Sequence, residues 1–326
     1  MTSSRRLLCK AALALTTTVY LGSPMAQNYP DKTLKIVVGA PAGGTADLIA
    51  RVLSEGIAAQ LGQPVMVDNK PGAAGILGLQ ELLKSPRDGH TMMVSVNGLV
   101  SEIPHAIKMP VDPLKEVRPL VELARTGLLM VGGPQVPASN LKEAVAYVKA
   151  NPGKISYASY SPGTLSHTLG LAFNKLAGID MTHVGYKGSP PALNDVMAGH
   201  VAFMFDGPAT SVPLIKAGKI KAFATTAPTR LGILPDVPTF AELGFKEMTE
   251  VAWMGLWVTP DVPAAAQQKL RDAVLKVMQQ ASVRERFSAL GLEPGSQATP
   301  DELMRSLRVA SDKQAAELKA IGFKPE

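Results

Sequence analysis

The sequence predicts an α/β fold of two domains, each a mostly parallel sheet flanked by helices. The chain has 326 residues, of which 46% are apolar, enough to bury two medium-sized cores. Short apolar runs of strand length alternate with segments of helical spacing, which is the pattern of parallel sheets. This alternation occurs in residues 34–96 and again in residues 155–225, so we expect two separate sheets.

The first alternating series begins with a buried strand at residues 34–38. Apolar residues then recur at helical spacing over residues 48–61. The series continues as strand, helix and strand at residues 65–67, 76–84 and 91–96. Right-handed crossovers place the loops after parallel strands at one edge of the sheet, so we expect residues 40–47 to lie near Asn97.

The chain is predicted to cross between the two domains near residue 126. Residues 117–124 and 128–131 are strand-like, and the prolines that follow break the regularity. Ser139 is expected to cap the next helix. The second series of strands covers residues 155–160, 181–184, 201–205 and 220–225. Asp206 comes directly after one of these strands, at the edge where α/β sheets bind ligands.

The last part of the chain is expected to return to the first sheet. Residues 251–258 form a strand that holds both tryptophans, and helices without a further alternating series follow. The last helix opens with the capping box Thr299-Pro300-Asp301-Glu302. The predicted division is domain 1 over residues 27–125 and 250–326, and domain 2 over residues 126–249.

Residues 1–26 are predicted to be a secretory signal peptide. Arg5 and Arg6 precede an apolar stretch too short to cross a membrane, and Ala26 is a small residue at the expected cleavage point. The paired arginines also fit a twin-arginine export signal, although ordinary signals can contain such pairs. We therefore expect a periplasmic protein. Cys9, the single cysteine, lies in the signal, which leaves the mature chain without a thiol for a disulfide, a metal site or a nucleophile.

Charge and motifs argue against several function classes. The formal charge of +6 falls to +3 without the three basic signal residues, and no basic stripe remains for nucleic acid. The five histidines form no metal-binding motif, and Gly-x-Ser-x-Gly is absent. We therefore predict no catalytic residue, no metal and no cofactor.

The turn at residues 40–47, Ala-Pro-Ala-Gly-Gly-Thr-Ala-Asp, is the first candidate binding site. Gly43 and Gly44 allow a ligand to approach the backbone, and Thr45 lies where the free N–H groups of the first helical turn point outward. Such a turn can hold an anion. Neither a dinucleotide fingerprint nor a Walker loop fits the sequence, and a plain connecting turn remains the alternative.

This turn occurs together with further motifs that span nearly the whole mature chain. They are Tyr29-Pro30-Asp31-Lys32, Asn69-Lys70-Pro71-Gly72, Pro86-Arg87-Asp88-Gly89-His90 and Tyr186-Lys187-Gly188-Ser189-Pro190. Together they resemble the Bug family, the extracytoplasmic solute receptors of tripartite tricarboxylate transporters. The resemblance implies a two-domain periplasmic-binding-protein-like fold of the Venus flytrap class, type II. It also implies a small carboxylate ligand in the cleft and membrane transporter subunits as partners of a monomeric receptor.

A second turn, at residues 160–167, repeats the order of strand, Pro-Gly, hydroxyl and helix start. Two such turns at sheet edges could close on opposite ends of one ligand. The resemblance implies that both turns grip a carboxylate, without lysine or arginine in either. The predicted ligand-binding residues are Ala42, Gly43, Gly44, Thr45, Asp47, Asn97, Ser161, Gly163, Thr164, Ser166, His167 and Asp206.

Several of these residues also fit plain structural roles. Asp47 suits a partner of the helix dipole, His167 a residue at a helix start, and Asp206 a turn former. Lys187 reads as a solvated loop lysine or as an anion contact. Two other functions remain open: an exported hydrolase or lyase that acts on a small carboxylate through Asp47, His167 and Asp206, and a protein that presents its ligand to a sensor. An aliphatic diacid, an amino acid and an aromatic acid all remain possible ligands.

Overall fold

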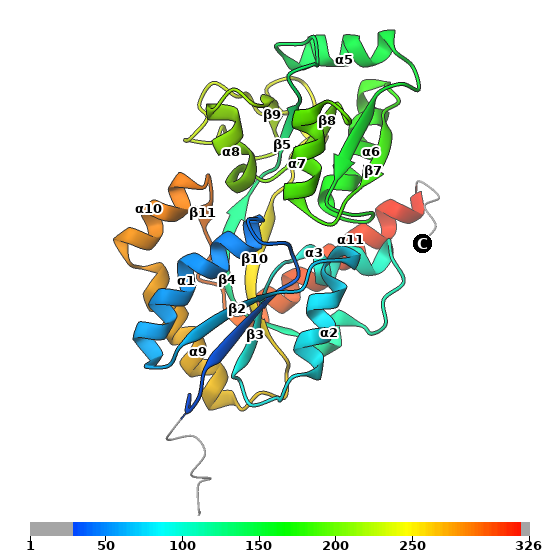
Figure 1. The fold of residues 1–326 in the computed structure, drawn as a ribbon. Helices are drawn as coiled ribbons and strands as arrows, with labels where there is room; N and C mark the ends of the chain where they lie inside the picture. Colours follow the sequence, from blue (N-terminus) through cyan, green and yellow to red (C-terminus); the bar gives the residue numbers. More distant parts are fainter. Residues whose placement is uncertain (1–28, 321–326) are drawn as a thin grey trace, which may run out of the picture.

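The computed structural model describes residues 29–320, and the predicted signal peptide lies outside them. Figure 1 shows two lobes stacked one above the other, each built around one sheet. We call the six-stranded sheet with its helices lobe 1, and the five-stranded sheet with its helices lobe 2. The two sheets confirm the expected α/β architecture.

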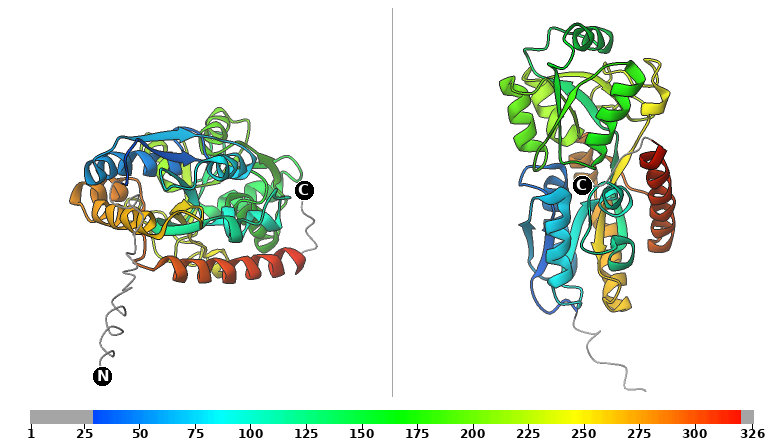
Figure 2. Two further views of the ribbon diagram at one scale, coloured as in Figure 1. Left: turned by 90° about the horizontal axis from the view of Figure 1, so that it is seen from below. Right: turned by 90° about the vertical axis from the view of Figure 1, so that its right-hand side faces the viewer.

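The sheet of lobe 1 has the strand order β11-β4-β10-β3-β1-β2. These strands are β1 (Leu34–Val38), β2 (Val65–Asn69), β3 (Thr91–Val96), β4 (Arg118–Thr126), β10 (Ala252–Val258) and β11 (Glu293–Pro294). Helices α1 (Thr45–Leu61), α9 (Ala264–Met278) and α10 (Ala281–Ala289) share one core with the sheet. Helices α2 (Ile76–Lys84), α3 (Gly98–Ser101) and α11 (Pro300–Ala320) share another core with Trp257. The short α4 (Pro113–Glu116), η2 (Ala73–Gly75) and η3 (Ile103–His105) complete the lobe. As expected, the C-terminal helices return to the first sheet, and α11 runs along its flank (Figure 2).

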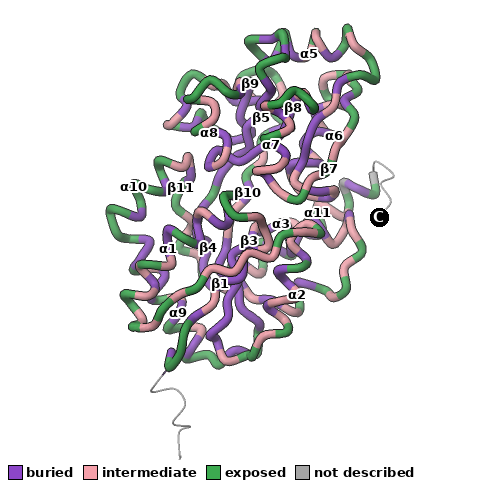
Figure 3. Tube along the Cα trace, in the orientation of Figure 1, coloured by how far each residue is buried: buried purple, intermediate pink, exposed green. Residues whose placement is uncertain are grey.

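The sheet of lobe 2 has the strand order β7-β6-β8-β5-β9. These strands are β5 (Leu129–Gly132), β6 (Ser156–Ser159), β7 (Thr182–Gly185), β8 (Phe203–Asp206) and β9 (Lys221–Thr225). One core includes α5 (Leu141–Ala150), α6 (Leu165–Ala177) and residues of η4 (Lys246–Met248), and the other includes α7 (Ser189–Ala198) and α8 (Pro208–Lys216). The central strands of both sheets are buried, the edge strands β2, β7 and β11 are more exposed, and the outer faces of the helices are exposed (Figure 3).

The sheets are mixed, which corrects the expectation of mostly parallel sheets. In lobe 1, β10 is antiparallel to both of its neighbours, β3 and β4. In lobe 2, β5 is antiparallel to both β8 and β9. The physical reason is the crossing of the chain: β5 and β10 each enter their sheet from the other lobe, so they run opposite to the strands that lead toward the cleft. Of the remaining pairs, β11 with β4 is also antiparallel, whereas β1 with β2 and β3, and β6 with β7 and β8, are parallel as expected.

Local sequence signals explain where the helices start and stop. Helix α1 buries Ile49, Leu53 and Ile57 on one face, and it ends at Gly62, whose left-handed backbone lets its N–H bond the Ala58 carbonyl at 2.9 Å. The predicted capping box is present, because the Thr299 N–H and hydroxyl both donate to Glu302 Oε2. The helix α5 is capped by Asn140 and not by Ser139, because Asn140 Oδ1 accepts from the Glu143 N–H at 2.9 Å.

Within residues 29–320, none of the helices combines the length and the apolar character needed to span a membrane.

Candidate functional site

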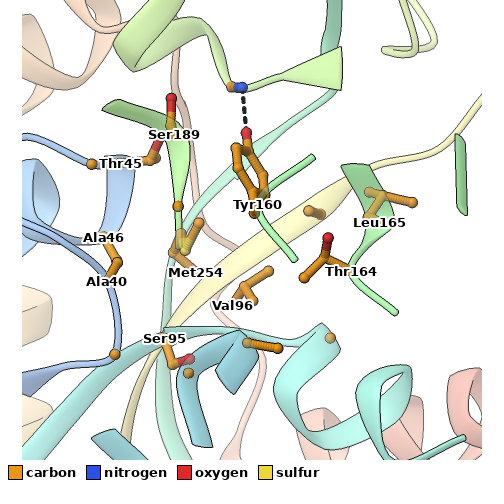
Figure 4. A pocket seen from close by; sticks show the side chains of 18 of the residues that line it. Ala40, Thr45, Ala46, Ser95, Val96, Tyr160, Thr164, Leu165, Ser189 and Met254 are labelled. Atoms are coloured by element: carbon orange, nitrogen blue, oxygen red, sulfur yellow. Dashed lines mark hydrogen bonds between the residues drawn. The ribbon is translucent and has the colours of Figure 1, made fainter. Parts of the chain in front are cut away.

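A cavity lies between the two lobes, and both lobes contribute to its wall. It encloses about 1070 Å³ of empty space, including the part open to solvent. Most of the lining consists of glycine and aliphatic residues, among them Met254 and Val96, which Figure 4 shows near its centre. The polar residues of the lining are Thr45, Ser95, Glu102, Thr126, Tyr160, Thr164, Lys187 and Ser189. This is an apolar site with a few polar groups, the composition typical of small-molecule pockets.

Five helices begin at the wall of this cavity. The residues that precede the first turns of α1, α2, α6, α7 and α8 all line it, and they are Gly44, Gly75, Thr164, Gly188 and Gly207. No described side chain caps any of these five helix starts. The positive dipole ends of five helices therefore converge on one space, with free N–H groups mainly from α1, α2 and α6, because Pro190, Pro191 and Pro208 carry no N–H in the first turns of α7 and α8. This arrangement favours an anion.

The first turn owes its shape to glycine and to a carboxylate. Gly43 has φ +79°, which a residue with a side chain rarely adopts. Asp47 is buried, and its carboxylate accepts from the Gly43 N–H at 2.8 Å and from Asn69 Nδ2 and Arg51 Nε at 3.0 Å each. Burial raises the pKa of Asp47, but these hydrogen bonds outweigh it and hold the pKa below its usual value. Asp47 is therefore ionised and holds the turn in shape from behind, and we call a side chain with this role the brace of its turn.

The second turn has the same backbone with a different brace. Gly163 has φ +77°, and Thr164 occupies the same extended conformation before α6 as Gly44 does before α1. The Gly163 N–H donates to His167 Nδ1 at 3.1 Å. The His167 ring packs against His183 at 3.9 Å between ring centroids. His183 lies in a buried setting that lowers its pKa to about 4, with a further contribution from His167.

A buried carboxylate holds the lobe 2 wall together. Asp206 is fully buried and accepts hydrogen bonds from the hydroxyls of Ser189 and Thr210 at 2.6 Å each, and from Ser211. Burial raises the pKa of Asp206 although these hydroxyls oppose the shift. Tyr160 Oη accepts from the Gly207 N–H at 2.6 Å, the bond drawn in Figure 4. Burial, followed by the Asp206 charge, raises the pKa of Tyr160 well above 10.0. Asp206 thus ties the starts of α7 and α8 to one point.

Glycines of lobe 2 touch lobe 1 at three places around the cavity. A methyl group on Gly163 would lie 2.5 Å from Ala106 Cβ, and one on Gly188 would lie 2.6 Å from Pro41 Cδ. A methyl group on Gly207 would lie 3.0 Å from Thr45 Oγ1. The lobes therefore contact each other around the cavity at positions where lobe 2 carries no side chain.

Of the predicted ligand-binding residues, the structure places three in the cavity wall: Gly44, Thr45 and Thr164. The other nine lie beside or behind the wall. They are Ala42, Gly43, Asp47, Asn97, Ser161, Gly163, Ser166, His167 and Asp206. Several have clear supporting contacts: Asn97 bonds the Trp253 backbone in both directions at 2.9 Å, and Ser161 accepts from the Thr164 hydroxyl at 2.7 Å. Ser166 donates to the Phe205 carbonyl.

Sequence reasoning missed the wall formed by α7 and α8. Gly188, Ser189 and Gly207 line the cavity, and so does Glu102. Lys187, for which the sequence left open a solvated lysine or an anion contact, lines it too. The signal was a glycine directly before each helix, the same pattern that marked the first turn. Among the residues that the structure describes, no group of three histidine, cysteine, aspartate or glutamate side chains is placed to hold a metal ion.

Comparisons with known proteins show which family and which solved structures this chain is similar to. The profile of the tripartite tricarboxylate transporter family receptor, TctC, matches residues 49–323. The structure of the periplasmic binding protein BugD is 30% identical, with a TM-score of 0.86 over 91% of this chain and 100% of that one. MatC from Rhodopseudomonas palustris, solved with bound malate, is 30% identical with a TM-score of 0.82 over 88% of this chain and 99% of that one. Rpa4515 from R. palustris, solved with adipate, is 26% identical with a TM-score of 0.87 over 91% of this chain and 100% of that one.

These similarities also remove one of the two other functions that the sequence left open. The family and the structural neighbours are solute-binding proteins and not enzymes, which removes the hydrolase or lyase that we considered from Asp47, His167 and Asp206. The chain belongs to the tripartite tricarboxylate transporter receptor family, whose members are periplasmic solute-binding proteins.

Proposed function

We propose that this receptor captures a small carboxylate in the cavity between its lobes and delivers it to the membrane subunits of a tripartite tricarboxylate transporter. The observation that carries the proposal is the convergence of five uncapped helix starts on one largely apolar cavity. The malate and adipate bound by two related proteins support the same ligand class.

The proposed binding mode uses backbone dipoles more than ion pairs. No arginine occurs among the described residues of the lining, so N–H groups and hydroxyls hold the carboxylate. Each helix start contributes about 0.3–1 kcal/mol, and more where it is buried. A site of this kind binds an anion without the strength of a buried ion pair, which suits a receptor that must release its cargo.

Gly44, Thr45 and Thr164 are the proposed ligand contacts from the predicted set. Gly43, Asp47, Gly163 and His167 hold the two turns in shape, while Asn97 and Asp206 hold the strands and helices behind them. We further propose that residues 27–125 and 250–326 move against residues 126–249 when the ligand enters, and that residues 1–26 direct export of a monomeric receptor to the periplasm.

Calorimetry with malate and adipate tests the proposal directly. Thr45→Ala and Thr164→Ala should each weaken binding by about 1–3 kcal/mol, because each removes a hydroxyl from one side of the cavity. X-ray scattering should show a smaller radius of gyration with ligand than without it. If only one of the two variants matters and the radius stays constant, the ligand sits on a single lobe. If neither acid binds and none of a wider panel of carboxylates does, the proposed ligand class is wrong.

A further inference from the structure

Lys187 is the one cationic side chain of the cavity wall within the described residues. It is exposed, and no acidic side chain of residues 29–320 pairs with its ammonium group. The binding mode proposed above, which relies on helix starts, makes no use of this charge. A lysine that lines an anion-binding cavity and has no protein partner is free to meet a ligand.

The backbone around Lys187 is held firmly at the wall. The Tyr186 N–H donates to the Ser159 carbonyl at 3.0 Å, and the Gly188 N–H donates to the Tyr160 carbonyl at 3.1 Å. These bonds continue the parallel ladder of β6 and β7 beyond the ends of the strands. Gly188 also packs against Pro41 of the first turn. The Lys187 backbone is therefore fixed beside the first turn, and its side chain lines the cavity.

The only acidic side chain of the described lining lies on the other lobe. Glu102 follows α3, and its carboxylate lies beside Gly98 at the start of that helix. Glu102 has an interaction of its own within the protein, so Lys187 carries the charge of the described lining that a ligand can meet.

We infer that Lys187 is a specificity-determining residue that selects acids with two carboxylates over acids with one. The helix starts hold the first carboxylate, and the Lys187 ammonium meets the second. A ligand whose far end is a methyl group gains nothing from the ammonium, so the charge separates the two classes. This inference rests on the proposed function, because it requires a carboxylate in the cavity.

The test uses pairs of acids of equal chain length, adipate with hexanoate and succinate with butyrate. Calorimetry should show that Lys187→Gln raises the Kd of the better-bound diacid about threefold to fivefold, as expected for one exposed ion pair, while the Kd of its monoacid changes less than about twofold. Lys187→Arg should keep the preference for the diacid, since it keeps the charge. Added salt should weaken diacid binding to the wild type more than to Lys187→Gln.

Lys219→Gln is the matched control, because Lys219 is an exposed lysine of lobe 2 outside the lining. Lys219→Gln should leave the Kd of the diacid and of the monoacid unchanged. The inference is overturned if Lys187→Gln changes the Kd of the diacid and the Kd of the monoacid equally, changes neither Kd, or has the same effect on them as Lys219→Gln. If wild-type protein binds none of the four acids and no other carboxylate, the proposed function fails and this inference fails with it. These two failures are distinct, because the first occurs in a protein that does bind carboxylates.

Discussion

The two turns at the cavity share a backbone and differ in the side chain that braces it. Gly43 and Gly163 have φ values of +79° and +77°, and each donates its N–H to the side chain four residues later. In lobe 1 that side chain is the carboxylate of Asp47, and in lobe 2 it is the imidazole of His167. An aspartate and a histidine thus stabilise the same backbone conformation in the two turns.

The difference decides how each turn responds to acid. Asp47 stays ionised because Arg51, Gly43 and Asn69 all donate to it, with a pKa below the usual range. His167 braces its turn through a ring nitrogen that must stay unprotonated to accept the Gly163 N–H. A proton on that nitrogen replaces an acceptor with a donor and removes the brace. The lobe 1 turn is therefore held by an ionised acceptor, and the lobe 2 turn by a ring nitrogen that accepts only without a proton.

Of the predicted changes, replacing Asp47 or His167, the side chains that hold the two turns in shape, should lower the free energy of unfolding the most. Asp47→Ala leaves three donors without their shared acceptor, so the free energy of unfolding should fall by about 3 kcal/mol, the upper end for a hydrogen-bonded charged group. His167→Ala removes the ring nitrogen that accepts the Gly163 N–H and leaves space where a buried ring was, and should cost about 2 kcal/mol. Urea unfolding measures both.

Asp180→Ala, at an exposed aspartate, is the control for loss of a carboxylate and should stay within about 0.5 kcal/mol of the wild type. Equal losses for Asp47→Ala and this control would show that the lobe 1 turn needs no brace.

Acid should weaken the folded state through the histidine pair. His183 has a pKa of about 4 in the folded protein against 6.5 in the unfolded chain, so the unfolded chain binds a proton that the folded state rejects as pH falls through this range. Stability should therefore decrease from about pH 6.5 toward pH 4, by about 2 kcal/mol after allowance for partial exposure of the ring.

Unfolding measured at several pH values checks this, with His183→Gln to flatten the profile and His200→Gln, an exposed histidine, as the control. Hydrogen exchange should report earlier loosening at Gly163 than at Gly43. Identical pH profiles for wild type and His183→Gln would place the acid sensitivity elsewhere.

A methyl group at the two matched glycines should separate backbone strain from lobe contact. Gly43→Ala and Gly163→Ala place the same strain on the backbone, about 1 kcal/mol. Only the methyl at Gly163 meets the other lobe, at Ala106 Cβ, whereas nothing lies within 4 Å of a methyl at Gly43. Gly163→Ala should therefore lower affinity for adipate or malate about tenfold more than Gly43→Ala, at equal loss of stability. Equal affinities would mean that the contact at Ala106 is not needed for binding.

Most of the fold could be read from the sequence because its elements are marked by local signals. Alternating apolar runs, glycine ends and the Thr299 capping box are properties of short segments, and the observed strands and helices follow them closely. The direction of β5 and β10 could not be read, because a strand that enters from another lobe has the same local pattern as one that does not. Asn140 replaced Ser139 as a cap because both are good caps and only the tertiary fit decides.

The site was harder to predict because its wall is mostly backbone. Thr45 and Thr164 were found through their glycine turns, but Asp47, His167 and Asp206 were singled out for their chemistry and lie behind the wall. Gly188 and Gly207 give no chemical signal of their own. They reach the cavity only because α7 and α8 start at the same sheet edge as α6, which depends on the packing of the whole lobe.

The central place of β10 in lobe 1 also sets an order for folding during synthesis. β10 lies between β3 and β4, yet it is made more than a hundred residues after either of them. Until residues 252–258 leave the ribosome, β3 and β4 have no strand to join them, whereas all five strands of lobe 2 are already complete. The lobe that begins the chain is therefore the last to close its sheet, and the inserted lobe is the first that can fold.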